Sequence, residues 1–470
     1  MDESKIGMSH QTLVSNAGQA AKFPQYLAAI IVTIGGFISG TCLGWTSPTS
    51  NPLVEESQYN FTISKDDFSW IGSLMPVGAL VACPLVGWLV DRIGRKNTIL
   101  VLVFPAVVGW ALMIWAESVT MFCIGRFISG IAGGGYTIVV PLYTNEYAET
   151  SIRGTLGTYF QLQLNLGILF TYVIGTITTV FWLTTACTIV PIVYGGMVMF
   201  LPESPIYYLK NKKVEEARQA LQWFRGGSYD VEPELSGMQK NIEIMESERV
   251  PILEAFSTTP AKRGLVIGLG VMAFQQLSGV NSVIFYVTSI FKDAGSTMDP
   301  NIQTIIVGVV AVVFTYISTL VVDRMGRRPL LLLSDFVMAI CTFFLGVYFY
   351  LKNKTEFDTA SISWLPILSV CAFMIVFSLG FGPIPWMFIS EVLPRQISGY
   401  ASSVCCCFNW ICVFLVTRFF GDVSAAIGAY GSFWLFTVIS GIGTAFVYFI
   451  VPETKGKTLE EVQILLGGST

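Results

Sequence analysis

Three amide side chains stand close together inside an apolar stretch of this sequence. Gln275, Gln276 and Asn281 belong to the motif QQLSGVN, within a run that is otherwise apolar from Gly264 to Phe291. In lipid, each unsatisfied polar group costs several kcal/mol. Because an amide both donates and accepts hydrogen bonds, these side chains require polar partners.

Helix geometry separates two of these amides. Gln275 and Asn281 lie about 120° apart on an ideal helix, so they cannot both face one small ligand unless the cavity wraps around the helix or the helix bends. Ser278 and Gly279 stand between them, and Gly and Ser residues are a common cause of kinks. The sequence therefore predicts an irregular helix at this motif.

The composition indicates a protein built from many membrane-spanning helices. Of the 470 residues, 53% are hydrophobic and 12% are charged, whereas soluble domains carry about 25% charged residues. The net charge of −4 adds little, because the distribution of charge matters more in a membrane protein.

Twelve apolar runs have about the length that crosses a bilayer, roughly 20 residues each. They are expected at 25–47, 68–90, 98–116, 120–142, 154–178, 182–201, 263–291, 302–322, 329–351, 364–390, 399–420 and 431–451. The predicted fold is an all-α membrane protein. Its expected parts are an N-terminal tail 1–24, a six-helix bundle 25–201, a partly helical linker 202–262, a second six-helix bundle 263–451 and a C-terminal tail 452–470.

Basic residues orient the predicted spans, because Lys and Arg are enriched in cytoplasmic loops. With both termini in the cytoplasm, only four of the 27 basic residues fall in outer loops: Lys65, Lys292, Lys352 and Lys354. Two N-x-S/T sequons, at Asn60 and Asn353, lie in outer loops of the same topology, where glycosylation occurs.

The sequence gives little support for a metal site, a nucleotide-binding site or covalent catalysis. The single histidine, His10, lies in the polar N-terminal tail. The ten cysteines all lie in apolar stretches, where they behave as small hydrophobic residues. Because no phosphate-binding loop, metal cluster or nucleophile with a base is present, we expect no enzymatic activity, no cofactor, no metal, no nucleic-acid partner and no obligate protein partner.

The two halves of the sequence repeat each other. DRIGRKN, starting at Asp91, matches DRMGRRP, starting at Asp323, and PES at Pro202 matches PET at Pro452. A glutamate follows the fourth span, and another follows the tenth. Three matches in the same order indicate a duplicated six-span unit.

The motifs together resemble the sugar-porter family of the major facilitator superfamily. They occur in the order GWLVDRIGRKN, GRFISGIAGGG, PLYTNEYAETSIRG, PESPIYYL, QQLSGVN, DRMGRRP, GPIPWMFISEVLP and PETKGKTLEE. The segments LQWFRGGSYDVEPEL and LGWTSP look most like the insect facilitated trehalose transporter group and the related animal facilitative hexose carriers. The resemblance implies two pseudo-symmetric six-helix bundles and passive transport of a neutral sugar, trehalose or a hexose such as glucose, by alternating access. Transporters built from repeats bind substrate near the membrane midplane, between the repeats.

The resemblance also implies a sugar site made of neutral amides and indoles. Amides pair with sugar hydroxyls and aromatic faces cover the ring, so no buried charge is needed. The implied sugar-contacting residues are Gln161, Gln275, Gln276, Asn281, Trp386, Asn409 and Trp410. Phe285 and Tyr286 resemble an aromatic outer gate. The alternative is that the polar residues join neighbouring helices, as is common in membranes.

Charged residues resemble the family's cytoplasmic gate. They are Asp91, Arg92, Arg95, Glu146, Arg153, Glu203, Asp323, Arg324, Arg327, Glu391 and Glu453. Such a network is expected to hold the inner ends of the helices together while the outer side is open, and so to bias a two-state equilibrium. The alternative is that the basic residues only anchor the loops on the cytoplasmic side.

Three positions depart from the family pattern. The span 8 amide of many hexose carriers aligns with Ala311, and an acidic residue before GPIPW aligns with Ser378. Hydrogen bonding to sugar should therefore differ from that of hexose carriers, and the small Ala311 is compatible with a disaccharide. Cys42 occupies the position where proton-coupled members carry an aspartate near the span 4 arginine, here Arg126.

These departures favour a uniporter, since a thiol with a pKa of about 8.5 is a poor proton carrier. Arg126 is then expected to pack near the outer end of span 4 or to snorkel. A proton–sugar symporter is the rival mechanism, and a non-transporting sugar sensor is a rival of another class. The expected location is the plasma membrane, with an internal vesicle membrane as the alternative.

Overall fold

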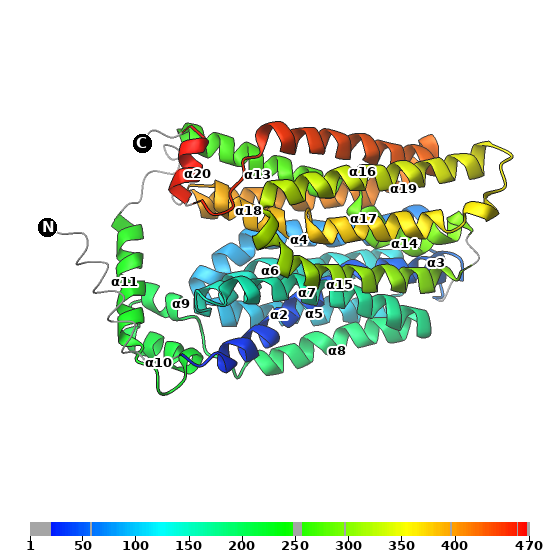
Figure 1. Cartoon of the computed structure of the whole chain (residues 1–470). Coiled ribbons are helices and arrows are strands. Elements are labelled where there is room, and N and C mark those ends of the chain that lie inside the picture. The colour runs from blue at the N-terminus through cyan, green and yellow to red at the C-terminus, as the bar shows by residue number, and fades with distance from the viewer. Residues whose placement is uncertain are drawn as a thin grey trace.

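The computed structural model describes residues 20–56, 59–247, 256–295, 298–394, 397–457 and 459–467. The described chain is dominated by long helices that run nearly parallel to one another (Figure 1). The first half contains α2 (Phe23–Gly44), α3 (Thr46–Val54), α4 (Lys65–Ile93), α5 (Arg95–Ile114), α6 (Val119–Tyr147), α7 (Arg153–Ile177) and α8 (Val180–Val198).

The second half repeats this pattern. It contains α13 (Thr259–Leu277), α14 (Val280–Ala294), α15 (Pro300–Met325), α16 (Arg327–Lys354), the short 3-10 helix η1 (Thr359–Ile362), α17 (Leu365–Leu379), α18 (Ile384–Val392) and α19 (Ser398–Ile450). The 53 residues of α19 include Gly428, whose backbone is not helical at φ +79° and ψ +158°. α19 thus consists of two helices, so the described residues contain twelve spans, as predicted.

Short helices cover one end of the bundles. They are α9 (Pro205–Lys210), α10 (Val214–Arg225), α11 (Glu232–Ser247) and α20 (Leu459–Leu465), at the left of Figure 1. We call this the basic end, because the turns before Arg95 and Arg327 lie there. The opposite end, where α3 and α14 lie, carries Asn60 and Asn353, both exposed, and is called the sequon end. Asn353 lies in the last turn of α16 and not in the predicted loop.

The sequence repeat is also a repeat of packing. In the first half α2 packs on α7, α4 on α6, and α5 on both α6 and α8. In the second half α13 packs on α19, α15 on α17, and α16 on both α17 and α19. The halves meet where α4 contacts α19, α7 contacts α15 and α3 contacts α14. The molecule is therefore two pseudo-symmetric bundles with a shared seam.

One span predicted as a continuous helix is broken: span 10 divides at Gly380–Pro383, between α17 and α18. Span 1 instead continues beyond its predicted end, because α3 follows α2 directly and Trp45 between them has a helical backbone. Pro383 has no N–H to donate, and the two glycines of GFGP favour a turn. The break in span 10 leaves backbone carbonyls without helical partners, which inside a membrane need other donors.

Candidate functional site

Span 7 is interrupted at the QQLSGVN motif. α13 ends at Leu277, and Gly279 takes a left-handed conformation with φ +94° before α14 begins at Val280. A Cβ added to Gly279 would lie 2.6 Å from the Phe436 ring, so both the backbone angle and the space favour glycine. The predicted irregularity in this helix is confirmed.

The interruption brings four amides into one cluster. Gln276 Nε2 donates to Asn409 Oδ1 at 3.1 Å, and Asn409 Nδ2 donates to Gln275 Oε1 at 2.9 Å. Asn281 Nδ2 donates to Gln276 Oε1. None of the four side chains is more than 7% exposed. The bend thus brings together Gln275 and Asn281, which would point in different directions on a straight helix. Side chains of α13, α14 and α19 form one hydrogen-bonded group.

Gln275 also holds the broken span 10. Its Nε2 donates to the carbonyl oxygens of Phe381 at 2.7 Å and Gly382 at 3.0 Å. These carbonyls lie in the turn between α17 and α18, where the helical bonds are missing. Gln275 therefore joins helices in this conformation, as the alternative interpretation of the amides predicts.

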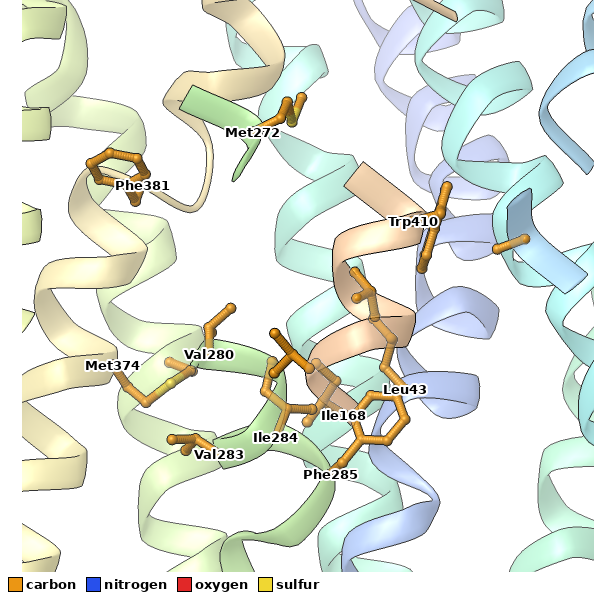
Figure 2. Packing of buried hydrophobic residues seen from close by; sticks show 14 of the residues in the cluster. Leu43, Ile168, Met272, Val280, Val283, Ile284, Phe285, Met374, Phe381 and Trp410 are labelled. Atoms are coloured by element: carbon orange, nitrogen blue, oxygen red, sulfur yellow. The ribbon is translucent and has the colours of Figure 1, made fainter. Parts of the chain in front are cut away.

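An apolar wall lies beside the amide cluster. Ile284 and Phe285 of α14 approach Ile168 of α7 (Figure 2). Trp410, one residue after Asn409, is 5% exposed. An amide group flanked by aromatic and aliphatic side chains can hold a ligand that has both hydroxyls and an apolar face.

Two predicted site residues stand apart from the cluster. Gln161 is half-buried on α7, in the first bundle, and Trp386 is 39% exposed on α18. Within the described residues neither forms a hydrogen bond to the four amides. A ligand that touches all the predicted residues must therefore bridge the seam between the bundles.

The sequon end is closed over this site. Phe285 is fully buried, and Tyr286 donates its hydroxyl to the Thr417 carbonyl at 3.0 Å while its ring meets Phe68 of the other bundle. Further contacts cross the seam at this end. They are Ser47 with Thr288 at 2.9 Å, Ser50 with Ser289 at 3.1 Å, Tyr172 with the Ile284 carbonyl at 2.8 Å, Arg418 with Asp66 at 2.9 Å, and Lys292 with Glu55.

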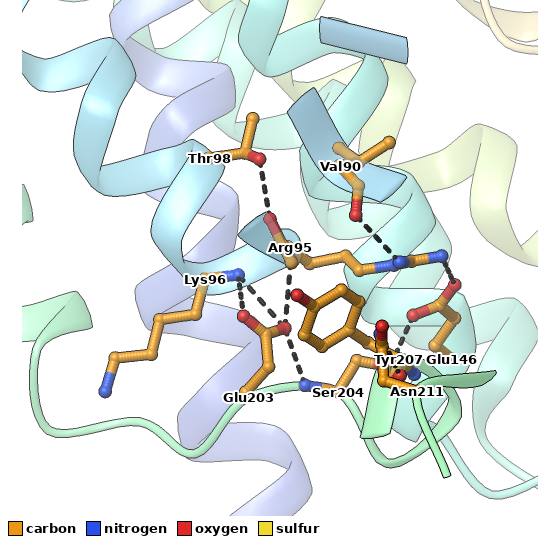
Figure 3. A network of polar contacts seen from close by, with 10 residues as sticks. Val90, Arg95, Lys96, Thr98, Glu146, Glu203, Ser204, Tyr207 and Asn211 are labelled. Carbon is orange, nitrogen blue, oxygen red and sulfur yellow. Dashed lines mark hydrogen bonds and ion pairs between the residues drawn. The ribbon is translucent and has the colours of Figure 1, made fainter. Parts of the chain in front are cut away.

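At the basic end, the first-half charges form a network inside one bundle (Figure 3). Arg95 Nη2 lies 2.7 Å from Glu146 Oε1, and both side chains are buried. The Glu203 carboxylate accepts the backbone N–H groups of Arg95 at 2.9 Å, Lys96 at 3.0 Å and Ser204 at 2.7 Å. Burial raises the pKa of Glu203, and these N–H donors oppose the rise.

The second half repeats this geometry. Arg327 pairs with Glu391 at 3.3 Å, and Glu453 accepts the backbone N–H groups of Arg327 at 3.1 Å and Arg328 at 3.0 Å. Glu203 and Glu453 thus bind the N-termini of α5 and α16, where the helix dipole favours an anion. The preceding turns need glycine, because φ is +94° at Gly326, like +90° at its first-half counterpart.

The remaining predicted gate residues lie outside these contacts. Asp91, Arg92 and Arg324 are exposed, and Arg153 donates to the Ala148 carbonyl at 3.1 Å. The side chain of Asp323 lies outside the described residues. Among the described residues, the ion pairs at the basic end stay within one half of the chain, and those that cross the seam lie at the sequon end. In this conformation the network therefore braces each bundle separately.

Arg126 packs in the core, and the snorkelling alternative is wrong. Its side chain is fully buried in α6 and donates to the carbonyl oxygens of Cys42 at 2.8 Å and Ile71 at 3.2 Å. The guanidinium lies 5.4 Å from the centroid of the Trp45 ring. Carbonyl dipoles and a ring face, with no carboxylate among the described partners, surround this cation.

Sequence reasoning missed two polar positions. Asn165 Nδ2 donates to Thr315 Oγ1 at 2.7 Å across the seam. Asp335 of α16 is fully buried against α19, where a Cβ on Gly443 would lie 2.1 Å from Oδ2. The signal for Asn165 was available, since it follows Gln161 by four residues on the same helical face.

Comparison with known proteins agrees with this geometry. The profile of the sugar (and other) transporter family matches residues 28–466. The facilitated trehalose transporters Tret1 of Culex quinquefasciatus and Polypedilum vanderplanki are 41% and 42% identical to the chain. Each match covers 94% of this chain, and 85% and 88% of the respective relatives.

Solved structures show the same fold. The proton:xylose symporter XylE of the major facilitator superfamily, bound to 6-bromo-6-deoxy-D-glucose, matches with a TM-score of 0.77 and 24% identity over 94% of this chain and 99% of that chain. The inward open conformation of XylE from E. coli matches with a TM-score of 0.76 and 23% identity over the same shares. At this identity the likeness establishes the fold and not the mechanism, and the fold predicted from the motifs is confirmed.

Proposed function

The chain belongs to the sugar (and other) transporter family, and we propose that it carries a neutral sugar across a membrane by facilitated diffusion. The observation that carries this proposal is the buried cluster of four uncharged amides at the interruption of span 7. Uncharged donors and acceptors match sugar hydroxyls without the cost of burying charge. A member of a transporter family is not an enzyme.

Trehalose is the first substrate to test. Two relatives that match most of the chain and most of their own length are called facilitated trehalose transporters. Glucose is the second, because single hexoses present the same hydroxyl chemistry. The proposed sugar contacts are Gln161, Gln275, Gln276, Asn281, Trp386, Asn409 and Trp410, with Phe285 and Tyr286 as the outer gate.

Alternating access follows from the seam. Contacts at the sequon end close one entrance, while the charge networks at the basic end brace the bundles 25–201 and 263–451 separately. In the opposite state, the guanidinium groups of the exposed Arg153 and Arg324 are available to pair with carboxylates across the seam. Exposed ion pairs contribute only about 0–1 kcal/mol each, but several together can bias two states of similar energy.

The direction of the chain in the membrane follows the basic residues. We assign the basic end to the cytoplasm and the sequon end to the outside of a plasma membrane. Asn60 and Asn353 are both exposed at that outer end, as glycosylation requires. An internal vesicle membrane remains the alternative location.

Uniport is favoured over proton symport by the surroundings of Arg126. Its described partners are backbone carbonyls and an indole ring, and Cys42 stands where a carboxylate would be needed. A proton-coupled mechanism needs a group that exchanges its proton during the cycle, and this position lacks one.

The test is uptake of radiolabelled trehalose and glucose into oocytes, with and without an inward proton gradient. We expect saturable uptake that stops at equal concentrations inside and outside in both conditions. Gln161→Ala should raise KM, while Gln163→Ala is a matched control, because Gln163 is half-buried about 160° away on the same helix. Accumulation above equilibrium under the gradient would establish symport, and no uptake of either sugar would refute the proposal.

A further inference from the structure

Asn165 occupies a special place in the seam between the bundles. It lies on α7, four residues after Gln161, so the two amides are on one face of the helix. Its side chain is 8% exposed and donates from Nδ2 to Thr315 Oγ1 at 2.7 Å. Thr315 belongs to α15, in the other bundle, and is 3% exposed. This is a buried side-chain bond between the two moving parts.

A small cavity adjoins this bond. Asn165 lines it together with Tyr172, Ile284, Ala311 and Met374. Ile284 follows Asn281 by three residues on α14, so the cavity lies one helical turn from the amide cluster. Figure 2 shows Val283 between Met374 and Ile284, and all three line this cavity.

Ala311 makes this cavity different from that of a hexose carrier. Ala311 precedes Thr315 by four residues on α15 and contributes only a methyl group. The amide expected at this position in hexose carriers is missing, and Asn165 supplies an amide to the same cavity from the opposite bundle. The cavity therefore keeps a polar group and gains the space that a larger side chain would fill.

We propose that Asn165 is a sugar-contacting residue that determines specificity, and that it takes the place of the missing span 8 amide. This inference rests on the proposed function. The amide has two N–H donors and one oxygen acceptor, and in the described structure only one N–H is used, on Thr315. The other donor and the oxygen serve a sugar hydroxyl. In this closed conformation the cavity beside Ala311 is too small for a sugar ring, and it receives the second ring of a disaccharide when the bundles move apart.

Two variants distinguish a residue that binds sugar from one that only joins two helices. Asn165→Leu removes the amide, whereas Thr315→Val removes only its protein partner and keeps the amide. If Asn165 binds sugar, the first change raises KM and the second does not. If Asn165 only joins the bundles, both changes remove the same bond and should have equal effects.

The experiment measures KM and maximal uptake rate for trehalose and glucose in oocytes, normalised to transporter at the cell surface. We expect Asn165→Leu to raise the KM for trehalose about threefold to tenfold, the size of one lost hydrogen bond, and to change the KM for glucose less. Thr315→Val should keep both KM values within about twofold. Equal effects of the two variants, or an unchanged trehalose KM in Asn165→Leu, would overturn the inference.

A third variant tests the cavity while the Asn165–Thr315 bond stays intact. Ala311→Leu fills the space beside the amide and should raise the KM for trehalose more than the KM for glucose. An equal change for both sugars would overturn the assignment of a disaccharide ring to this cavity. If the unchanged protein transports neither sugar, the proposed function fails instead, so the two failures are distinguishable.

Discussion

Arg418 provides the sharpest test of how the sequon end is held closed. Its side chain is 11% exposed and reaches from α19 to α4, in the other bundle. Nη2 lies 2.9 Å from Asp66, and the guanidinium lies 4.6 Å from the centroid of the Trp70 ring. Nη1 pairs at 2.9 Å with Asp422 of its own helix. Nη1 also lies 3.5 Å from Ser69 Oγ of α4, and the Phe419 ring is 5.5 Å from the guanidinium. One side chain thus makes three contacts across the seam and two within its bundle.

The cost of opening this end can be worked from those contacts. The contact with Trp70 is worth about 0.5–1 kcal/mol, because the ring is partly exposed. The pair with Asp66 adds about 0–1 kcal/mol, because that carboxylate is 61% exposed. Arg418→Met removes both and keeps the apolar stem. The closed state should lose roughly 0.5–2 kcal/mol, which shifts the equilibrium about 2–30-fold toward opening.

Thiol labelling measures this shift. A cysteine in place of Ile284, which is buried behind the proposed outer gate, should react with a membrane-impermeant reagent only when the sequon end opens. Arg418→Met should label fastest, Asp66→Asn more slowly, and the control Asp422→Asn at the rate of the unchanged protein. Equal rates in all variants, or a faster rate in Asp422→Asn than in Arg418→Met, would refute this account of the closed end.

Three further predictions follow from buried or constrained groups. Glu146→Gln leaves the buried Arg95 without its anionic partner, which should cost about 3–5 kcal/mol of stability and lower the melting temperature in detergent; the double variant with Arg95→Met should recover most of it. Cys83 Sγ and Cys406 Sγ lie 3.5 Å apart across the seam, so oxidation with copper phenanthroline should link them by a disulfide and stop uptake. Dithiothreitol should restore uptake, and Cys83→Ser should be insensitive to the oxidant. Gly279→Ala forces a side chain into a left-handed conformation, which costs about 1–2 kcal/mol before its clash in the core, and should reduce surface expression; normal expression and uptake would contradict the need for glycine.

Local patterns predicted much of the fold. Apolar runs located the twelve spans, and the spacing of Gln275 and Asn281 predicted an interruption that the structure has at Gly279. Such features depend on neighbours along the chain, so the sequence contains them. The glycines and proline of GFGP also favour the break in span 10. It was not predicted, because the motif lies within a long apolar run that indicates a single helix.

Long-range partners were not predictable in the same way. The carbonyls that receive the Gln275 amide lie more than 100 residues away, at Phe381 and Gly382. The sequence motifs also did not predict that Glu203 and Glu453 bind helix N-termini. The same pattern of acidic and basic residues is equally consistent with ion pairs between glutamate and arginine side chains. These contacts depend on which turns the two bundles bring together.

Asp335 is a second position, besides that of Cys42, at which a proton carrier could be sought. It is a fully buried acid in α16, packed against Gly443 of α19 and in no ion pair within the described residues. A buried carboxylate without a cation is costly, which favours the neutral acid. Because α16 and α19 pack together within the second half, rocking of the bundles need not expose Asp335 to either side. Asp335→Asn keeps the shape and the neutrality, so uptake should stay at equilibrium and independent of the proton gradient. Gradient-driven accumulation that disappears in Asp335→Asn would instead make this residue the coupling site and the protein a symporter.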